Sequence, residues 1–475
     1  MSTNISRRKV VAGAAWAAPV VAASAAVPAF ASSTECEYAS APKFNISGQP
    51  SGAKDTVKFT VPARVDKIRF EVAGGAGGGS DQVAGGSGAL VTGEIPVKEG
   101  QVIELVAAAG GVAYLISEPG VHSKAIWQTR PATGGKGYGN GGDVNEQAVP
   151  ADAKARVDAN WPGASDMKRY LYGGSGGGSS ALIIDGTPVA VAGGGGGAGI
   201  RTQPGTNNMP AGDKYYNPKA VDASTTRLSD PDVKSVLPAG ASASAAAGDD
   251  AETSISHYTV LKPHTTDGTA MKVAGGKGGN GGQGGAGGEQ PLLYKLANVY
   301  GVLGFTSQNQ QELFSSSTAG DKGGSGFDGK GADGVFAYSY QIDNHDISKL
   351  EIVHATNPLN LKDTTSYRED YTRMSFNGYQ TVVSAGGGAG YGGGGSGAAR
   401  GLSSIITSQK WNANEEPTRY RQNVGALLQA GAGGAGGSYV APSVPNGTIA
   451  SANNAAKESG VRNPGYVKVT LCERS

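Results

Sequence analysis

The sequence is poor in the residues and runs from which catalytic, metal and membrane sites are usually built. Its 475 residues include two cysteines and five histidines, and 17% are charged. Beyond residue 31 there is no run of about 20 apolar residues, so no membrane span is predicted in the mature chain. A formal net charge of +1 provides no field that would attract nucleic acid, and no nucleic-acid partner is predicted.

Motifs for catalysis and metal binding are also missing. Ser175 satisfies G-x-S-x-G, but it lies in a glycine tract without the strand–turn–helix context of a nucleophile. Residues 323–328 begin like a calcium-binding nonapeptide repeat, yet the apolar position is absent and the pattern does not recur. The histidines are scattered without paired metal-ligand spacing, at His122, His257, His264, His345 and His354. We therefore predict no enzymatic activity, no cofactor and no metal.

The first 31 residues have the order of a bacterial secretory signal peptide. A basic segment with Arg7 and Arg8 precedes an Ala/Val-rich apolar stretch, which ends in small residues at Ala31. The arginine pair favours the twin-arginine type, with an ordinary Sec signal as the alternative. We predict cleavage after Ala31 and export by the twin-arginine route to an extracellular or cell-wall-associated location.

The two cysteines lie near opposite ends of the mature chain, at Cys36 and Cys472. In an oxidising exterior this arrangement favours a disulfide that joins the chain ends. Two free thiols are the alternative.

Glycine is strongly enriched in the sequence. Its 79 residues are more than twice the usual share. It occurs in clusters, and residues 275–289 form five Gly-Gly-X triplets. A period of three is typical of the polyproline II helix, and glycine at two positions in three lets neighbouring helices approach and bond backbone to backbone. The X positions are expected to face solvent. Flexible linkers are the alternative, but several clusters directly follow a strand-like run and an alanine, which favours packed glycine helices.

Alternating apolar and polar residues predict strands near both ends of the chain. The expected strands are 56–62, 66–72, 89–97, 102–106 and 466–471, with further strands within 256–261, 335–354 and 365–383. A short helix is expected in 290–318, a helix or loop in 402–428, and long surface loops in 200–270. The prediction is one domain over 32–475, with irregular insertions near 200–270 and 290–318. Its fold class is mostly β, an antiparallel β-sandwich with an embedded bundle of polyglycine II helices.

Aromatic residues in polar, irregular segments are candidate binding anchors, although packing over loop edges is the alternative for each. They are Trp127, Trp161, Tyr170, Tyr215, Tyr216 and Trp411.

Residues 173–199, with the glycine tracts GGSGGGS and AGGGGGAG around an apolar run, resemble the glycine-rich domain of the anaplastic lymphoma kinase and leukocyte tyrosine kinase receptors. Bacterial exported proteins carry similar domains. Residues 57–112, 381–401 and 465–471 support the same resemblance. It implies a β-sandwich around polyglycine II helices, as in the glycine-rich tips of some phage tail-fibre adhesins, and it places no functional residue on this chain.

These observations predict an exported, non-enzymatic surface or cell-wall-associated protein with a structural or adhesive role. Its expected partner is a cell-wall component or a protein or glycan receptor. A secreted binding module for a protein or glycan is the first alternative. An exported hydrolase is the least favoured, because no acidic or Ser/His constellation supports it.

Overall fold

The computed structural model describes most of the chain after residue 35, in these ranges: 36–79, 83–117, 127–149, 151, 169–201, 239–261, 266–291, 302–303, 316–341, 378–412, 415–455 and 458–474. The signal-peptide residues Arg7, Arg8 and Ala31 lie outside them. The named elements within these ranges are all strands, and nearly all their pairings are antiparallel. The predicted mostly β class is therefore confirmed.

Two sheets at one end of the molecule contain the strands predicted near both chain ends. The first has the order β1-β23-β4-β5-β22, with β2 also paired to β23. Its strands are β1 Glu37–Tyr38, β2 Phe44–Ser47, β4 Val65–Ala73, β5 Ala89–Pro96, β22 Thr448–Ser451 and β23 Tyr466–Glu473. The second has the order β21-β11-β10-β6-β3. Its strands are β3 Asp55–Thr60, β6 Val102–Ala107, β10 Ser180–Ile184, β11 Thr187–Ala192 and β21 Tyr439–Val440.

The alternation of the sequence decides which face of these strands is buried. In β4, Ile68 and Phe70 are almost fully buried, while the intervening Arg69 is exposed. Residues from both sheets contribute to one apolar cluster, including Leu105 on β6 and Val469 on β23. The main core is therefore shared by the two sheets, and Phe44 of β2 stacks on Phe59 of β3 beside it, with ring centroids 4.1 Å apart.

The described residues form four further sheets. One contains β12 Ile200–Arg201, β20 Glu415–Ala430, β19 Ala399–Asn412 and β15 Val302–Leu303 in that order, with β16 Ser316–Thr318 also paired to β19. Another contains β17 Phe336–Gln341, β18 Gly378–Val383 and β9 Arg169–Tyr172. Two hairpins pair β13 Ser254–Leu261 with β14 Thr266–Val273, and β7 Tyr114–Ser117 with β8 Trp127–Arg130.

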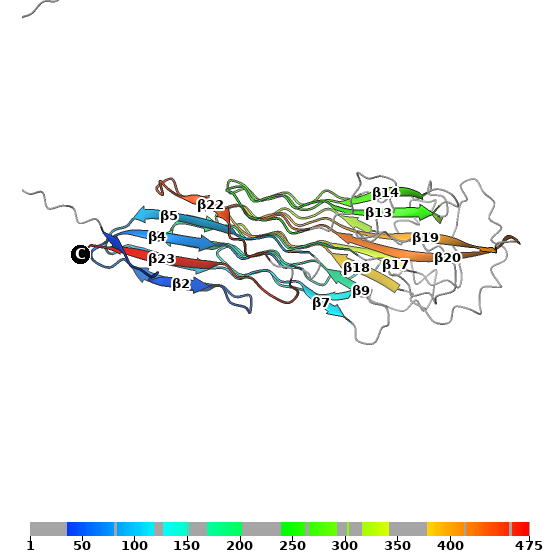
Figure 1. Ribbon diagram of the computed structural model, residues 1–475, viewed down its shortest axis with the longest axis horizontal. Coiled ribbons are helices and arrows are strands. Elements are labelled where there is room, and N and C mark those ends of the chain that lie inside the picture. Colours follow the sequence, from blue (N-terminus) through cyan, green and yellow to red (C-terminus); the bar gives the residue numbers. More distant parts are fainter. Residues whose placement is uncertain are drawn as a thin grey trace, which may run out of the picture.

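Glycine-rich segments connect these sheets and run lengthwise through an elongated molecule (Figure 1). Strands β4, β5 and β23 lie at one end with the C-terminus, and β19 and β20 lie toward the other. We refer to the connecting segments as the glycine-rich bundle. It comprises residues 74–79, 84–88, 108–113, 132–144, 173–179, 193–199, 239–243, 274–289, 320–335, 384–398 and 431–437. The predicted succession of strand, alanine and glycine tract is confirmed where β4 ends at Ala73 and β11 at Ala192.

The prediction of a helix or loop over 402–428 is wrong. Most of this segment belongs to the long hairpin of β19 and β20, whose register runs from Ala399 opposite Ala430 to Asn412 opposite Glu415. Each strand supplies backbone partners to the other along its whole length, and this cross-strand pairing outweighs local propensity. The strand predicted at 256–261 is confirmed within β13. The helix predicted in 290–318 falls largely outside the described residues, and its described parts at 302–303 and 316–318 are instead strands β15 and β16. Most of the loop prediction for 200–270 also lies outside them, but it is wrong for residues 266–270, which pair with β13 as part of β14.

Candidate functional site: the glycine-rich bundle and its polar clamp

Residues 193–198 illustrate how the bundle is held together. The amides of Gly194 and Gly197 donate to the carbonyls of Ala389 and Gly386, over 2.7 and 2.9 Å. Two amides three residues apart therefore bond to the same neighbouring segment. The interval matches the period of three in the sequence.

The next amides repeat the pattern in another direction. Gly195 and Ala198 donate to the carbonyls of Gly75 and Gly78, over 3.0 and 2.9 Å. The carbonyls of residues 193–198 accept from three further segments, through the amides of Ala89, Gly436, Gly177, Gly86, Gly433 and Gly174. One glycine-rich segment is thus bonded sideways to several others, and its buried backbone groups are satisfied without a sheet.

This arrangement requires glycine because the backbones are too close for a side chain. A Cβ placed on Gly196 would lie 1.9 Å from the carbonyl oxygen of Gly433, and one on Gly176 would lie 1.8 Å from that of Gly387. Both obstacles are backbone atoms, which cannot rotate away. The flexible-linker alternative does not fit these buried, mutually bonded segments.

The five Gly-Gly-X triplets form two antiparallel segments that are joined by a tight turn. The turn lies at Asn280–Gln283, where each residue's amide donates to the other's carbonyl over 2.9 Å. Gly281 and Gly282 occupy it with φ of +56° and +77°, a region that favours glycine. The expectation that the X positions face solvent is confirmed, since residues 277, 280, 283, 286 and 289 are all exposed.

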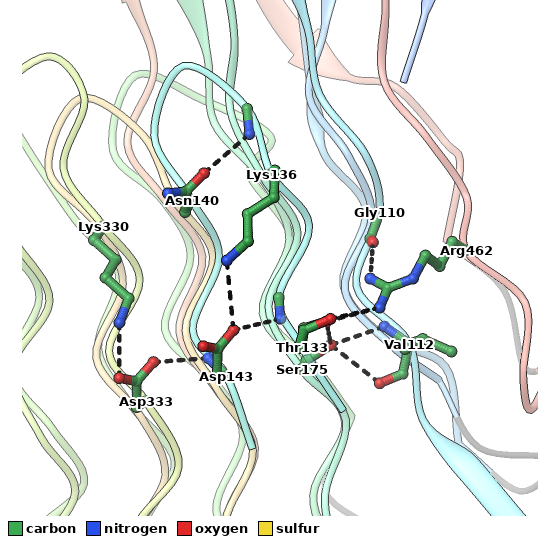
Figure 2. Close-up of polar contacts among 12 residues, drawn as sticks. Gly110, Val112, Thr133, Lys136, Asn140, Asp143, Ser175, Lys330, Asp333 and Arg462 are labelled. Atoms are coloured by element: carbon green, nitrogen blue, oxygen red, sulfur yellow. Dashed lines mark hydrogen bonds and ion pairs between the residues drawn. The ribbon is translucent and has the colours of Figure 1, made fainter. Parts of the chain in front are cut away.

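A polar clamp centred on Arg462 ties the end of the chain to the bundle (Figure 2). The Arg462 Nη1 atom donates to the carbonyl of Gly110 over 2.7 Å, and Nη2 donates to the carbonyl and Oγ1 of Thr133, each over 3.0 Å. Burial lowers the pKa of the guanidinium, but an arginine remains charged in proteins. One side chain thus joins three stretches of chain that are far apart in sequence.

Ser175 occupies the centre of the same region and is fully buried. Its Oγ accepts the amide of Val112 over 2.9 Å and lies 3.1 and 2.9 Å from the carbonyls of Val112 and Thr133. These described partners are all backbone groups. The hydroxyl therefore satisfies backbone polar groups where the glycine segments diverge.

Two carboxylates extend the clamp across the bundle (Figure 2). Asp143 Oδ1 accepts the amide of Gly134 over 2.7 Å, and the Asp143 amide donates to Asp333 Oδ1 over 2.7 Å. Lys330 Nζ lies 2.7 Å from Asp333 Oδ2. Side chains thus bond to amide groups at the margin of the bundle, where a glycine neighbour is missing.

We expect Arg462→Ala to lower the free energy of unfolding by about 2–3 kcal/mol, because charge-assisted bonds to partly buried carbonyls are lost. Urea denaturation followed by circular dichroism measures this. The control is Arg474→Ala, which removes an exposed arginine paired with Asp66 and should cost less than about 1 kcal/mol. Equal losses in the two variants would contradict the clamp.

The structure brings together the two cysteines that the sequence predicts to pair. Cys36 and Cys472 form a disulfide with Cα atoms 5.2 Å apart. The placement of aromatic anchors in loops is wrong for Trp127, Tyr170 and Trp411, which lie in β8, β9 and β19, where pairing with a neighbouring strand supplies the order. Trp161, Tyr215 and Tyr216 lie outside the described residues.

Within the described ranges no three His, Cys, Asp or Glu side chains gather as a metal site would require. Within residues 323–328, which began like a calcium repeat, residues 326–328 form a tight turn with Gly326 at φ +101°. Nor do those ranges contain a helix long and apolar enough to cross a membrane. The sequence analysis did not single out Arg462, Asp143 or Asp333, because their partners lie up to hundreds of residues away.

Comparison with known proteins adds no family. No protein-family model matches the chain. No curated protein sequence matches it either.

Proposed function

We propose that this protein is an exported bacterial surface or cell-wall-associated module with a structural and adhesive role. The observation that carries the proposal is the sideways, period-three hydrogen bonding of the glycine-rich bundle. A bundle with backbone bonds in several directions and no room for side chains resists bending and shear. Such a bundle is suited to serve as a rigid spacer.

We also propose that the bundle consists of polyglycine II helices and that the two sheets at the base form a β-sandwich. Bonding at every third residue, shown by Gly194 and Gly197 toward one neighbour, fits polyglycine II helices packed side by side. The common core between the sheets of β4 and β6 fits a β-sandwich at the base. Both features agree with the receptor and adhesin domains that the sequence resembles.

The chain ends support a base-and-tip arrangement. The disulfide joins Cys36 to Cys472, so both ends of the described chain meet at the end of the molecule that carries β4 and β23 (Figure 1). The opposite end, with the β19–β20 hairpin, projects away from them. Export through Arg7 and Arg8, with cleavage after Ala31, would deliver the cysteines to an oxidising exterior.

The test is cosedimentation of the mature protein, residues 32–475, with cell walls of the producing organism at low and high salt. Removal of Arg7, Arg8 and Lys9 with the signal peptide changes the formal net charge from +1 to 37 − 39 = −2. Because this charge is small, we expect retention that survives high salt, where exposed charges are screened. The same protein spun without walls corrects for self-association.

Absence of retention at both salt concentrations would overturn wall association. That result would favour the alternative of a released module that binds a protein or glycan elsewhere. Retention that disappears at high salt would also contradict the proposal, because it would indicate nonspecific charge attraction.

A further inference from the structure

Tight turns of the glycine-rich bundle meet at one place and are bonded to one another. The amide of Gly282 donates to the carbonyl of Tyr391, that of Gly326 to the carbonyl of Gly282, and that of Gly392 to the carbonyl of Gly326, over 3.3, 2.8 and 2.9 Å. These three glycines have positive φ. The turns therefore form a fixed row rather than independent loops.

An aromatic cluster lies on this row. The rings of Phe327 and Tyr391 stack with centroids 4.7 Å apart. Tyr439 lies 5.0 Å from Phe327 and 5.1 Å from Tyr391. Tyr138 belongs to the same region, packing with Phe327 and Tyr439 on the second sheet. We call these four residues the aromatic platform.

The platform packs on the second sheet and is partly exposed. Tyr138, Phe327 and Tyr439 pack on a small apolar cluster, which includes Ile183 of β10. Tyr439 also packs against the main core. All four platform residues are only partly buried, and none of the tyrosine hydroxyls is a buried group without a partner. Rings fixed by the fold lose little conformational entropy on binding, which favours affinity.

Each ring of the platform comes from a glycine tract or directly follows one. Tyr138, Phe327 and Tyr391 are single aromatics inside the tracts GGKGYGNGG, GGSGFDGKG and GGGAGYGGGG, and Tyr439 follows Gly437 and Ser438. The close backbone packing of the glycine-rich bundle does not require an aromatic side chain. An aromatic residue in the middle of a glycine tract is therefore the sequence signal that marks this place.

The rim of the platform is polar and carries little free positive charge. Asn280, Gln283 and Asp328 are exposed on the turns. Burial raises the pKa of the Tyr138 hydroxyl, and the nearby Asp328 and Glu104 carboxylates raise it further. Four lysines on the adjoining segments are paired with carboxylates, as Lys58–Glu104, Lys136–Asp143, Lys277–Asp250 and Lys330–Asp333. An anionic polymer would find acidic neighbours here and few free cations.

We propose that the aromatic platform binds a neutral β-1,4-linked polysaccharide, an inference that rests on the adhesive role proposed above and names its partner. A hexopyranose ring presents an apolar C–H face that packs on aromatic rings. Its hydroxyl groups suit the amide and carboxylate groups of Asn280, Gln283 and Asp328. A β-1,4 chain is extended, and the bonded turns at Gly282, Gly326 and Gly392 provide a row along which it would lie. The chain originates from the producer's own wall or from a foreign surface.

Calorimetric titration of the mature protein with chitohexaose and cellohexaose tests the site. We expect binding of at least one oligosaccharide, and a loss of affinity of at least about 10-fold in Tyr391→Ala, as for an aromatic anchor. Gln283→Ala changes an exposed rim residue outside any apolar cluster and should weaken binding less. The matched control is Tyr466→Ala, which removes a partly buried tyrosine on β23 and should leave affinity unchanged. Circular dichroism establishes that each variant is folded.

Binding of neither oligosaccharide would overturn the inference, as would equal losses in Tyr391→Ala and Tyr466→Ala. Stronger binding of dextran sulfate than of the neutral sugars would also overturn it. Wall cosedimentation in the presence of the bound oligosaccharide separates the two sources. Competition indicates the producer's wall, and oligosaccharide binding without wall retention indicates a foreign polysaccharide. Wall retention by a protein that binds neither oligosaccharide would leave the proposed function standing and reject the platform.

Discussion

Replacing Gly196 with alanine is expected to lower the free energy of unfolding by about 3 kcal/mol, the upper part of the usual range for overpacked interiors. The added Cβ would lie 1.9 Å from the carbonyl oxygen of Gly433 and 2.5 Å from its carbonyl carbon. That oxygen accepts the amide of Ala241, so moving it would disturb a second contact. Urea denaturation followed by circular dichroism measures the loss.

A glycine outside the bundle provides the control. A Cβ on Gly100 would meet no atom within 4 Å, although φ is +85° there. Gly100→Asn introduces a side chain that tolerates this region and should cost less than about 1 kcal/mol. Similar losses in the two variants would mean that close backbone approach is not what requires glycine in the bundle.

The contrast between these two glycines marks what the sequence can predict. Strands β4 and β23 follow from simple alternation, because one face of each is buried and a shift of one residue would expose the whole apolar set. The pairing of Val469 with Phe70 is then a consequence of bringing the chain ends together. The solvent-facing X positions of the glycine triplets follow from period three in the same way.

Local sequence patterns do not predict contacts between residues that lie far apart in the sequence. Nothing near residue 462 in the sequence indicates that its arginine bonds to Gly110 and Thr133. The turn at Asn280–Gln283 interrupts a tract whose triplet repeat continues unchanged, since glycine fits a turn as well as an extended segment. The β19–β20 hairpin is determined by partner strands rather than by its own residues.

The disulfide differs from these contacts because its effect lies mainly in the unfolded chain. In the folded protein β1 is only two residues long and pairs with β23 alone. The next strand, β2, is independently paired to β23 from Phe44 opposite Val469. Losing the covalent bond therefore removes few native contacts. It does, however, free two chain ends separated by 436 residues.

Reduction of Cys36–Cys472 is expected to lower the free energy of unfolding by about 5 kcal/mol, since the loop-entropy estimate increases with the number of residues closed. Urea denaturation with and without reductant measures the difference. The Cys36→Ser, Cys472→Ser double variant should match the reduced protein and should not respond to reductant. An unchanged midpoint on reduction would mean that the unfolded ends stay together without the bond. Reduction could instead affect β1 alone, seen as faster amide exchange at Glu37 and Tyr38 only. That result would show that the disulfide acts only on local order, and that the pairing of β2 with β23 already holds the two chain ends together.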